Sequence, residues 1–181
     1  MTVETFREDF LPYLNVMRTK ILDDYGDLAL KGLIDSRQTI YPLSADTKLL
    51  SKVIELLLMP VIEEFADAHQ YAIHPANAQN QYPDITLIHH SDSNDCIALD
   101  IKTTYRISPD KQGQSRVNEL TLGSYMGYFR TRHKPDKSTL AYDRYKKHFV
   151  LGLVYARKTT IDLKTFIGLM IFYIFRQSSA M

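Results

Sequence analysis

Two apolar segments separated by a short polar run constrain the fold of this chain more than any other feature. Residues 84–90 read D-I-T-L-I-H-H and residues 96–105 read C-I-A-L-D-I-K-T-T-Y, with five turn-forming residues, 91–95, between them. Strand-like runs joined by a loop of this length and composition predict a β-hairpin. Side chains alternate between the two faces of a strand, so Asp100 and Lys102 are expected to share one face.

The predicted hairpin also brings a second carboxylate to this pair. Folding the chain about Ser93 sets Asp84 opposite Lys102, within a residue or two. Two carboxylates are ligands that suit Mg²⁺, and a lysine beside them can stabilise charge or help position an attacking water. Asp84, Asp100 and Lys102 therefore indicate Mg²⁺-dependent hydrolysis of phosphodiester bonds. A plain surface ion pair remains the alternative, because Asp-x-Lys also occurs at 46–48 and 162–164.

Helical periodicity precedes the hairpin. Apolar residues recur at three- and four-residue intervals over 3–33, with Gly32 as a possible stop, and again over 47–69. Ser44 or Asp46 is expected to cap the second helix, and Pro60 to kink or break it.

The segments after the hairpin complete the expected fold. Residues 120–130 fit a strand or a short helix, and residues 149–155 read as a buried strand. Helices, then a hairpin, then mixed elements predict an α/β or α+β fold in which helices cover a mixed sheet. With 181 residues, the chain is expected to form a single domain, 1–181.

Two further features have alternative interpretations. Glu55 lies in an apolar helical run, where it is either a solvent-facing residue or a carboxylate kept for a cation or a base. Basic residues outnumber acidic ones between Arg130 and Lys147, which suits either a phosphate-binding patch or an ordinary solvated surface.

Composition narrows the remaining functional classes. Cys96 is the only cysteine, so an internal disulfide and a Cys₄ zinc site are excluded, and a cytoplasmic location is expected. The longest apolar run, 166–175, is too short for a membrane-spanning helix, and no membrane association is expected. No glycine-rich phosphate loop, H-E-x-x-H or G-x-S-x-G motif occurs, so a metal-independent small-molecule enzyme is a weaker alternative.

Several blocks of sequence resemble the EcoRV-type restriction endonucleases, which are type II enzymes of the PD-(D/E)xK nuclease superfamily. The resemblance runs in order from about residue 40 to about residue 157. The blocks are I-Y-P-L-S-A-D-T-K-L-L-S-K-V-I-E-L (40–56), Q-N-Q-Y-P-D-I-T-L (79–87), I-A-L-D-I-K-T-T-Y (97–105), L-T-L-G-S-Y (120–125) and G-L-V-Y-A-R (152–157).

This resemblance implies a homodimer that cleaves double-stranded DNA at a palindromic site with Mg²⁺ as cofactor. It implies that Asp84, Asp100 and Glu55 are acidic metal-site residues and that Lys102 is the catalytic lysine. It also implies that the N-terminal helix contributes to the dimer interface. The DNA-binding residues that it implies are Gln79, Asn80 and Gln81 in a minor-groove loop, and Thr103 and Thr104 near the backbone.

The last segment departs from the family pattern. Residues 165–181 show no Gly/Asn/Thr-rich loop of the kind that reads bases in the major groove. One expectation is a final buried strand in a shorter relative. The other is a truncated or frame-shifted chain, which would then be an inactive DNA-binding pseudo-nuclease.

Overall fold

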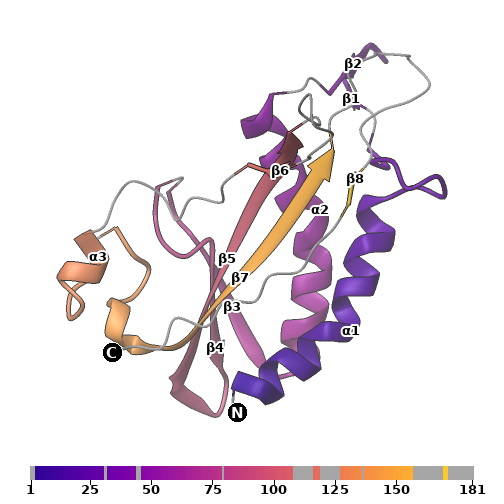
Figure 1. Cartoon of the computed structure of the whole chain (residues 1–181). Helices are drawn as coiled ribbons and strands as arrows, with labels where there is room; N and C mark the ends of the chain where they lie inside the picture. Colours follow the sequence, from indigo (N-terminus) through magenta and orange to yellow (C-terminus); the bar gives the residue numbers. More distant parts are fainter. Residues whose placement is uncertain are drawn as a thin grey trace.

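A mixed β-sheet with two long helices on one face forms the body of the protein (Figure 1). The computed structural model describes residues 3–30, 32–43, 46–78, 80–107, 116–118, 127–135, 137–156 and 169–170. In chain order the elements are α1 (Val3–Ile21), β1 (Gly32–Ile34), β2 (Ile40–Pro42), α2 (Thr47–Ala68), β3 (Tyr71–Pro75), β4 (Ile85–His89), β5 (Asp92–Ile107), β6 (Arg116–Val117), α3 (Gly127–Arg130), the 3₁₀ helix η1 (Tyr142–Arg144), β7 (Tyr145–Ala156) and β8 (Leu169–Met170).

The main sheet has the strand order β3-β4-β5-β7-β8, and β6 pairs with β5. Strands β3, β4 and β5 are antiparallel neighbours, whereas β5 and β7 run parallel over eleven residue pairs, from Cys96 with Tyr145 to Arg106 with Ala156. The short strands β1 and β2 form a separate two-stranded sheet. The predicted mixed sheet with flanking helices is therefore confirmed.

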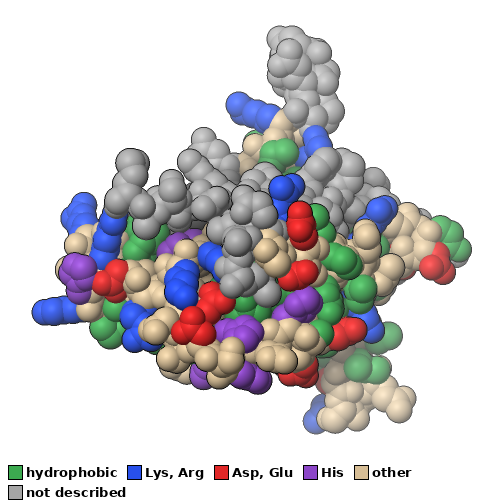
Figure 2. All heavy atoms as spheres, turned by 90° about the horizontal axis from the view of Figure 1, so that it is seen from below, with side chains coloured by type: hydrophobic (Ala, Val, Ile, Leu, Met, Phe, Trp, Pro, Cys, Tyr) green, Lys and Arg blue, Asp and Glu red, His purple; other side chains and the backbone are tan. Residues whose placement is uncertain are grey.

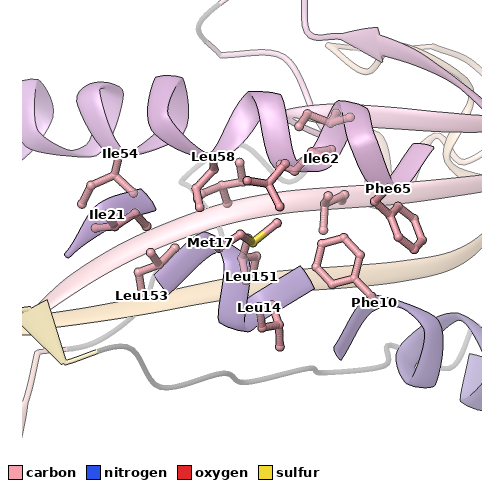
Figure 3. Close-up of a cluster of buried hydrophobic side chains, with 14 of the residues drawn as sticks. Phe10, Leu14, Met17, Ile21, Ile54, Leu58, Ile62, Phe65, Leu151 and Leu153 are labelled. Carbon is pink, nitrogen blue, oxygen red and sulfur yellow. The ribbon is translucent and has the colours of Figure 1, made fainter. Parts of the chain in front are cut away.

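One hydrophobic core joins α1 and α2 to the sheet. Phe10, Leu14 and Met17 of α1 and Ile54, Leu58 and Phe65 of α2 meet the side chains of Leu151 and Leu153 from β7 (Figure 3). The odd-numbered residues Ile97, Leu99 and Ile101 of β5 belong to the same core, as the strand alternation predicts. Asp100 and Lys102 therefore lie on the opposite face of the sheet, away from α1 and α2.

The hairpin forms with a register two residues from the predicted one. Ile85 pairs with Leu99, which brings Asp84 level with Asp100 and still within the predicted margin. The predicted loop 91–95 is wrong because β5 begins at Asp92. A bulge between Ile88 and His89 shifts the pairing, so His89 faces Asp92 and the turn shrinks to residues 90 and 91.

The predicted first helix is too long. It ends at Ile21, where Asp23 accepts hydrogen bonds from the backbone N–H groups of Tyr25 and Asp27 and so starts a turn. Gly26 has a φ of +77° in that turn, a conformation that glycine adopts without strain. Gly32 belongs to β1 and is not the helix stop.

The second helix begins as predicted and is not interrupted. Asp46 caps it by accepting from the N–H groups of Lys48 and Leu49. Of the predicted kink or break at Pro60, the break does not occur, because α2 continues to Ala68. Pro60 is exposed, so the Leu56 carbonyl that loses its amide partner can bind water instead. Among the described residues, no helix is long and apolar enough to cross a membrane.

The basic stretch between Arg130 and Lys147 does not form an uninterrupted positive patch. Lys146 lies 3.2 Å from Asp92, and the buried Lys147 lies 3.5 Å from Asp95. Within the stretch, His133 Nδ1 lies 2.5 Å from Oδ2 of Asp143, so its described part resembles an ordinary charged surface. Figure 2 shows acidic, basic and histidine side chains interspersed on one face of the molecule.

Candidate active site

Asp84 is fixed at the beginning of β4 by a contact to the neighbouring strand. Its Oδ2 accepts a hydrogen bond of 2.7 Å from the backbone N–H of Ile101 in β5. Its own carbonyl accepts from the N–H of Ala76, just beyond β3. The carboxylate is thus oriented by β5 while the backbone is attached to the segment after β3.

Lys102 lies between the two carboxylates that the sequence singled out. Its Nζ is 2.6 Å from Oδ2 of Asp100 and 4.0 Å from Oδ2 of Asp84. Asp100 and Lys102 are two residues apart on one strand face, and the hairpin register supplies Asp84 beside them. Asp84, Asp100 and Lys102 therefore come together as predicted.

Burial makes this arrangement electrostatically costly. The Asp100 side chain is only 6% exposed, and burial raises the pKa of this carboxyl from 3.8 to about 6. The nearby charge of Lys102 lowers that pKa, and the charge of Asp84 raises it. Two carboxylates that share one ammonium group retain excess negative charge, and their oxygen donors fit a hard divalent cation.

Glu55 lies on a different part of the site from Asp100. It lines a cavity of about 900 Å³ between α2 and the segment before β4, and its Oε2 lies 2.6 Å from Nζ of Lys52. Asp84 and Thr103 line the same cavity. Within the described residues, no three His, Cys, Asp or Glu side chains lie close enough together to hold a metal ion. A direct metal contact by Glu55 therefore stays a prediction.

The predicted DNA-binding residues have different surroundings. Gln79 lies outside the described residues, Asn80 is exposed, and the Gln81 side chain accepts from the N–H of Asn77 at 2.8 Å. Thr103 lines the cavity and hydrogen bonds with Ser51 of α2.

Thr104 is buried, with an exposed fraction of 3%, and its hydroxyl donates to the carbonyl of Asn118 at 2.9 Å. That arrangement gives no support to a DNA contact by Thr104, because its hydroxyl is already engaged within the chain. Along β5, Thr103 and Thr104 point to opposite faces, so the two threonines are not equivalent.

Comparison with known proteins identifies the family. The family described as Restriction endonuclease EcoRV matches residues 23–170 of this chain. The chain belongs to that family. It is 39% identical over 137 residues to the type II restriction enzyme EcoRV of Escherichia coli, an alignment that covers 75% of this chain and 53% of that protein. The chain therefore spans about half the length of this curated relative.

The match to the EcoRV family tests two parts of the sequence-based interpretation, the family and the fold. The matched region contains every predicted site residue, from Glu55 to Thr104. The resemblance to this family and the expected fold are thereby confirmed. The roles of individual residues are not tested by the match and remain predictions.

A cluster of aromatic side chains beside Asp100 was not predicted. Tyr82, Tyr128, Tyr142 and His148 stack on that face of the sheet, with 4.7 Å between the ring centroids of Tyr82 and Tyr128 and 4.4 Å between those of Tyr142 and His148. Burial, and then the charge of Asp100, raises the pKa of Tyr128 to about 12 and also raises that of Tyr82. Burial lowers the pKa of His148 to about 4.

Only weak indications of this aromatic cluster can be found in the sequence. Tyr82 directly precedes the Pro83–Asp84 pair, and His148 directly precedes the predicted strand 149–155. His148 reaches Tyr82 only because β7 pairs in parallel with β5, where His148 lies opposite Ala98. Parallel pairing across some fifty residues has no local sequence marker.

Proposed function

We propose that this chain is a type II site-specific deoxyribonuclease that hydrolyses phosphodiester bonds in double-stranded DNA with Mg²⁺ as cofactor. The observation that carries the proposal is the convergence of Asp84, Asp100 and Lys102, with Lys102 Nζ within 4.0 Å of both carboxylates. A buried carboxylate with a raised pKa beside a second carboxylate is a typical catalytic arrangement. Family membership supports the reaction class.

Asp84 and Asp100 would hold the metal, and Glu55 would add a further carboxylate from the cavity side. When bound, Mg²⁺ polarises a phosphoryl group and lowers the pKa of a coordinated water. Lys102 is suited to stabilise negative charge on the attacking water or on the phosphate, because its ammonium group already lies between the two carboxylates. The backbone N–H of Ile101 keeps the Asp84 carboxylate directed toward this position.

The cavity lined by Asp84 and Glu55 offers a place for the DNA backbone. Lys48 and Lys52 of α2 line it together with Asp84. Ammonium groups are common contacts to phosphate oxygens. Thr103 of β5 lines the same cavity, with its hydroxyl bonded to Ser51. Asn80 and Gln81, in the segment before β4, would reach the minor groove, as the sequence resemblance implies.

A homodimer that reads a palindromic site would complete the proposed function. A two-fold axis that relates two copies matches the symmetry of a palindrome and places one active site on each strand. Exposed apolar side chains on β1 and β2, among them Ile34, Ile40 and Tyr41, support an interface with another polypeptide.

Plasmid cleavage tests the proposal directly. We expect discrete bands from the purified protein with Mg²⁺, none with EDTA, and none from the Asp100→Asn variant. Asp92→Asn is the matched control, because Asp92 lies on the same strand, is exposed, and pairs with Lys146 far from the site. A folded wild-type protein that binds DNA without cutting it would overturn the catalytic proposal and favour a pseudo-nuclease.

A further inference from the structure

Tyr82 is held in place by both its side chain and its backbone. Its hydroxyl forms a 2.6 Å hydrogen bond with Nδ1 of His148 in β7, and its ring stacks on Tyr128 with an angle of 5° between the planes. Its N–H donates to the carbonyl of Lys137, and its carbonyl accepts from the N–H of Thr139, both at 2.9 Å. Few conformations satisfy all these contacts together.

His148 is an equally fixed partner. It lies opposite Ala98 in the parallel β5–β7 pair, so it shares the sheet face on which Asp100 lies. Its ring stacks on Tyr142 at 4.4 Å, and the residue is almost completely buried. The Tyr82–His148 hydrogen bond therefore joins the segment before β4 to the middle of β7.

Only Pro83 separates Tyr82 from Asp84, so the position of one residue constrains the other. The Asp84 carboxylate is oriented by the Ile101 N–H of β5, whereas the backbone that carries it is anchored through Tyr82 to β7. Two carboxylates at one site repel each other. An anchor on the backbone before Asp84 resists the movement that would separate Asp84 from Asp100.

We propose that the Tyr82–His148 hydrogen bond is a positioning device that holds Asp84 at the distance from Asp100 needed to bind a divalent cation. This inference rests on the proposed metal-dependent nuclease function. Tyr82 acts through Asp84 and has no contact with DNA or with the reacting phosphate in this role. The hydrogen bond corresponds to the outer-shell contacts that orient metal ligands, whose loss typically lowers metal affinity about 10- to 100-fold.

If Tyr82 had only a structural role, its substitution would lower folding stability without weakening cation binding. Tyr145 provides the matched comparison. Tyr145 is a buried tyrosine of the same face, with 6.2 Å between its ring centroid and that of Tyr82. Its hydroxyl bonds to Thr86 Oγ1 at 2.9 Å and accepts from the N–H of Leu140 at 3.2 Å. Thr86 lies as close to Asp84 in the sequence as Tyr82 does, but its backbone is paired with His74 of β3 and Ala98 of β5. Removing the Tyr145 hydroxyl therefore deletes buried hydrogen bonds while strand pairing still holds the backbone after Asp84.

The experiment compares Tyr82→Phe, Tyr145→Phe and the wild type, without DNA. Binding of MgCl₂ and MnCl₂ is measured by isothermal titration calorimetry, and folding stability by urea denaturation in EDTA. We expect both variants to lose stability, but only Tyr82→Phe to bind the cations about tenfold more weakly. In plasmid assays, Tyr82→Phe should require a correspondingly higher Mg²⁺ concentration and approach the wild-type rate when Mg²⁺ is saturating.

Two substitutions of His148 provide an independent check, including the case in which Tyr82→Phe does not fold. Asn can place a side-chain amide near the position of Nδ1, so His148→Asn should keep most of the cation affinity that His148→Ala loses. Equal cation binding by the wild type and Tyr82→Phe, or by the two His148 variants, would overturn the positioning role and leave the nuclease proposal standing. A folded wild-type protein that binds neither cation would overturn both proposals.

Discussion

Replacing Asp100 by Asn tests whether the negative charge of this side chain lowers the free energy of unfolding. Burial, opposed by Lys102 and reinforced by Asp84, raises the pKa of this carboxyl from 3.8 to about 6. That difference is about 2 pH units, and each unit corresponds to about 1.4 kcal/mol. The charged carboxylate therefore lowers the free energy of unfolding by on the order of 3 kcal/mol at neutral pH. Asn is nearly isosteric and has no charge to bury.

The raised pKa of Asp100 determines how its contribution to folding stability changes with pH. Below pH 3.8 the carboxyl is protonated in both the folded and the unfolded protein, and it does not contribute. Between pH 3.8 and about 6 the folded protein retains a proton that the unfolded chain has released, so this group makes stability fall as pH rises. Above about pH 6 the full destabilisation is present.

Urea denaturation in EDTA measures this difference. We expect Asp100→Asn to be more stable than the wild type by about 1 kcal/mol at pH 4.5 and by about 3 kcal/mol at pH 7.5. Excess Mg²⁺ should narrow the gap by stabilising only the wild type, since ligands stabilise the state that binds them.

Asp92→Asn is the control for this measurement. Hydrogen bonds from the N–H of Asn94 and then from the Lys146 side chain lower the pKa of Asp92, so its charged carboxylate stabilises the folded protein. Asp92→Asn should therefore slightly reduce the free energy of unfolding at pH 7.5. If Asp100→Asn is no more stable than the wild type at pH 7.5, or if the gap does not grow with pH, the reasoning is refuted.

Three further predictions follow from the site and the core. Lys102→Met should reduce plasmid cleavage at least about 100-fold while the protein still binds Mg²⁺ in calorimetry; retained cleavage would contradict a catalytic role for this lysine. Asp46→Ala removes the N-cap of α2 and should lower the free energy of unfolding by about 1 kcal/mol in urea, with the cleavage rate unchanged; an unchanged urea midpoint would argue against the cap. Phe65→Ala empties a fully buried position between α1 and α2 and should cost about 3 to 5 kcal/mol. Leu56→Ala, at an exposed position of the same helix, should change stability by less than about 0.5 kcal/mol, and similar losses in the two variants would contradict the assigned core.

The parts of the site that could be predicted are those that depend on local sequence. Alternation along β5 correctly separates Asp100 and Lys102 from the core residues Ile97, Leu99 and Ile101. The hairpin that delivers Asp84 joins two strands that are neighbours in the sequence, so their composition and the turn-forming residues between them are enough to predict the pairing, although not the exact turn.

The errors arise where a local detail or a distant partner decides the structure. The hairpin register differs by two residues because a bulge at Ile88 and His89 shortens the turn, and alternating patterns do not reveal bulges. The first helix ends early because the Asp23 side chain competes for backbone N–H groups that continued helix would use. The pairing of β5 with β7, which brings His148 to Tyr82, is set by the tertiary fold.

The parallel pairing of β5 with β7 also has a consequence for the order in which the protein folds. Asp84, Asp100 and Lys102 are joined by one hairpin, whereas the β5–β7 partners, such as Leu99 and Phe149, are separated by a long stretch of chain. Contacts between distant residues close large loops and tend to form late, while hairpins form quickly. The carboxylates should therefore come together in an early, flexible hairpin. We expect this hairpin to become rigid only when β7 pairs with β5 and brings His148 to Tyr82.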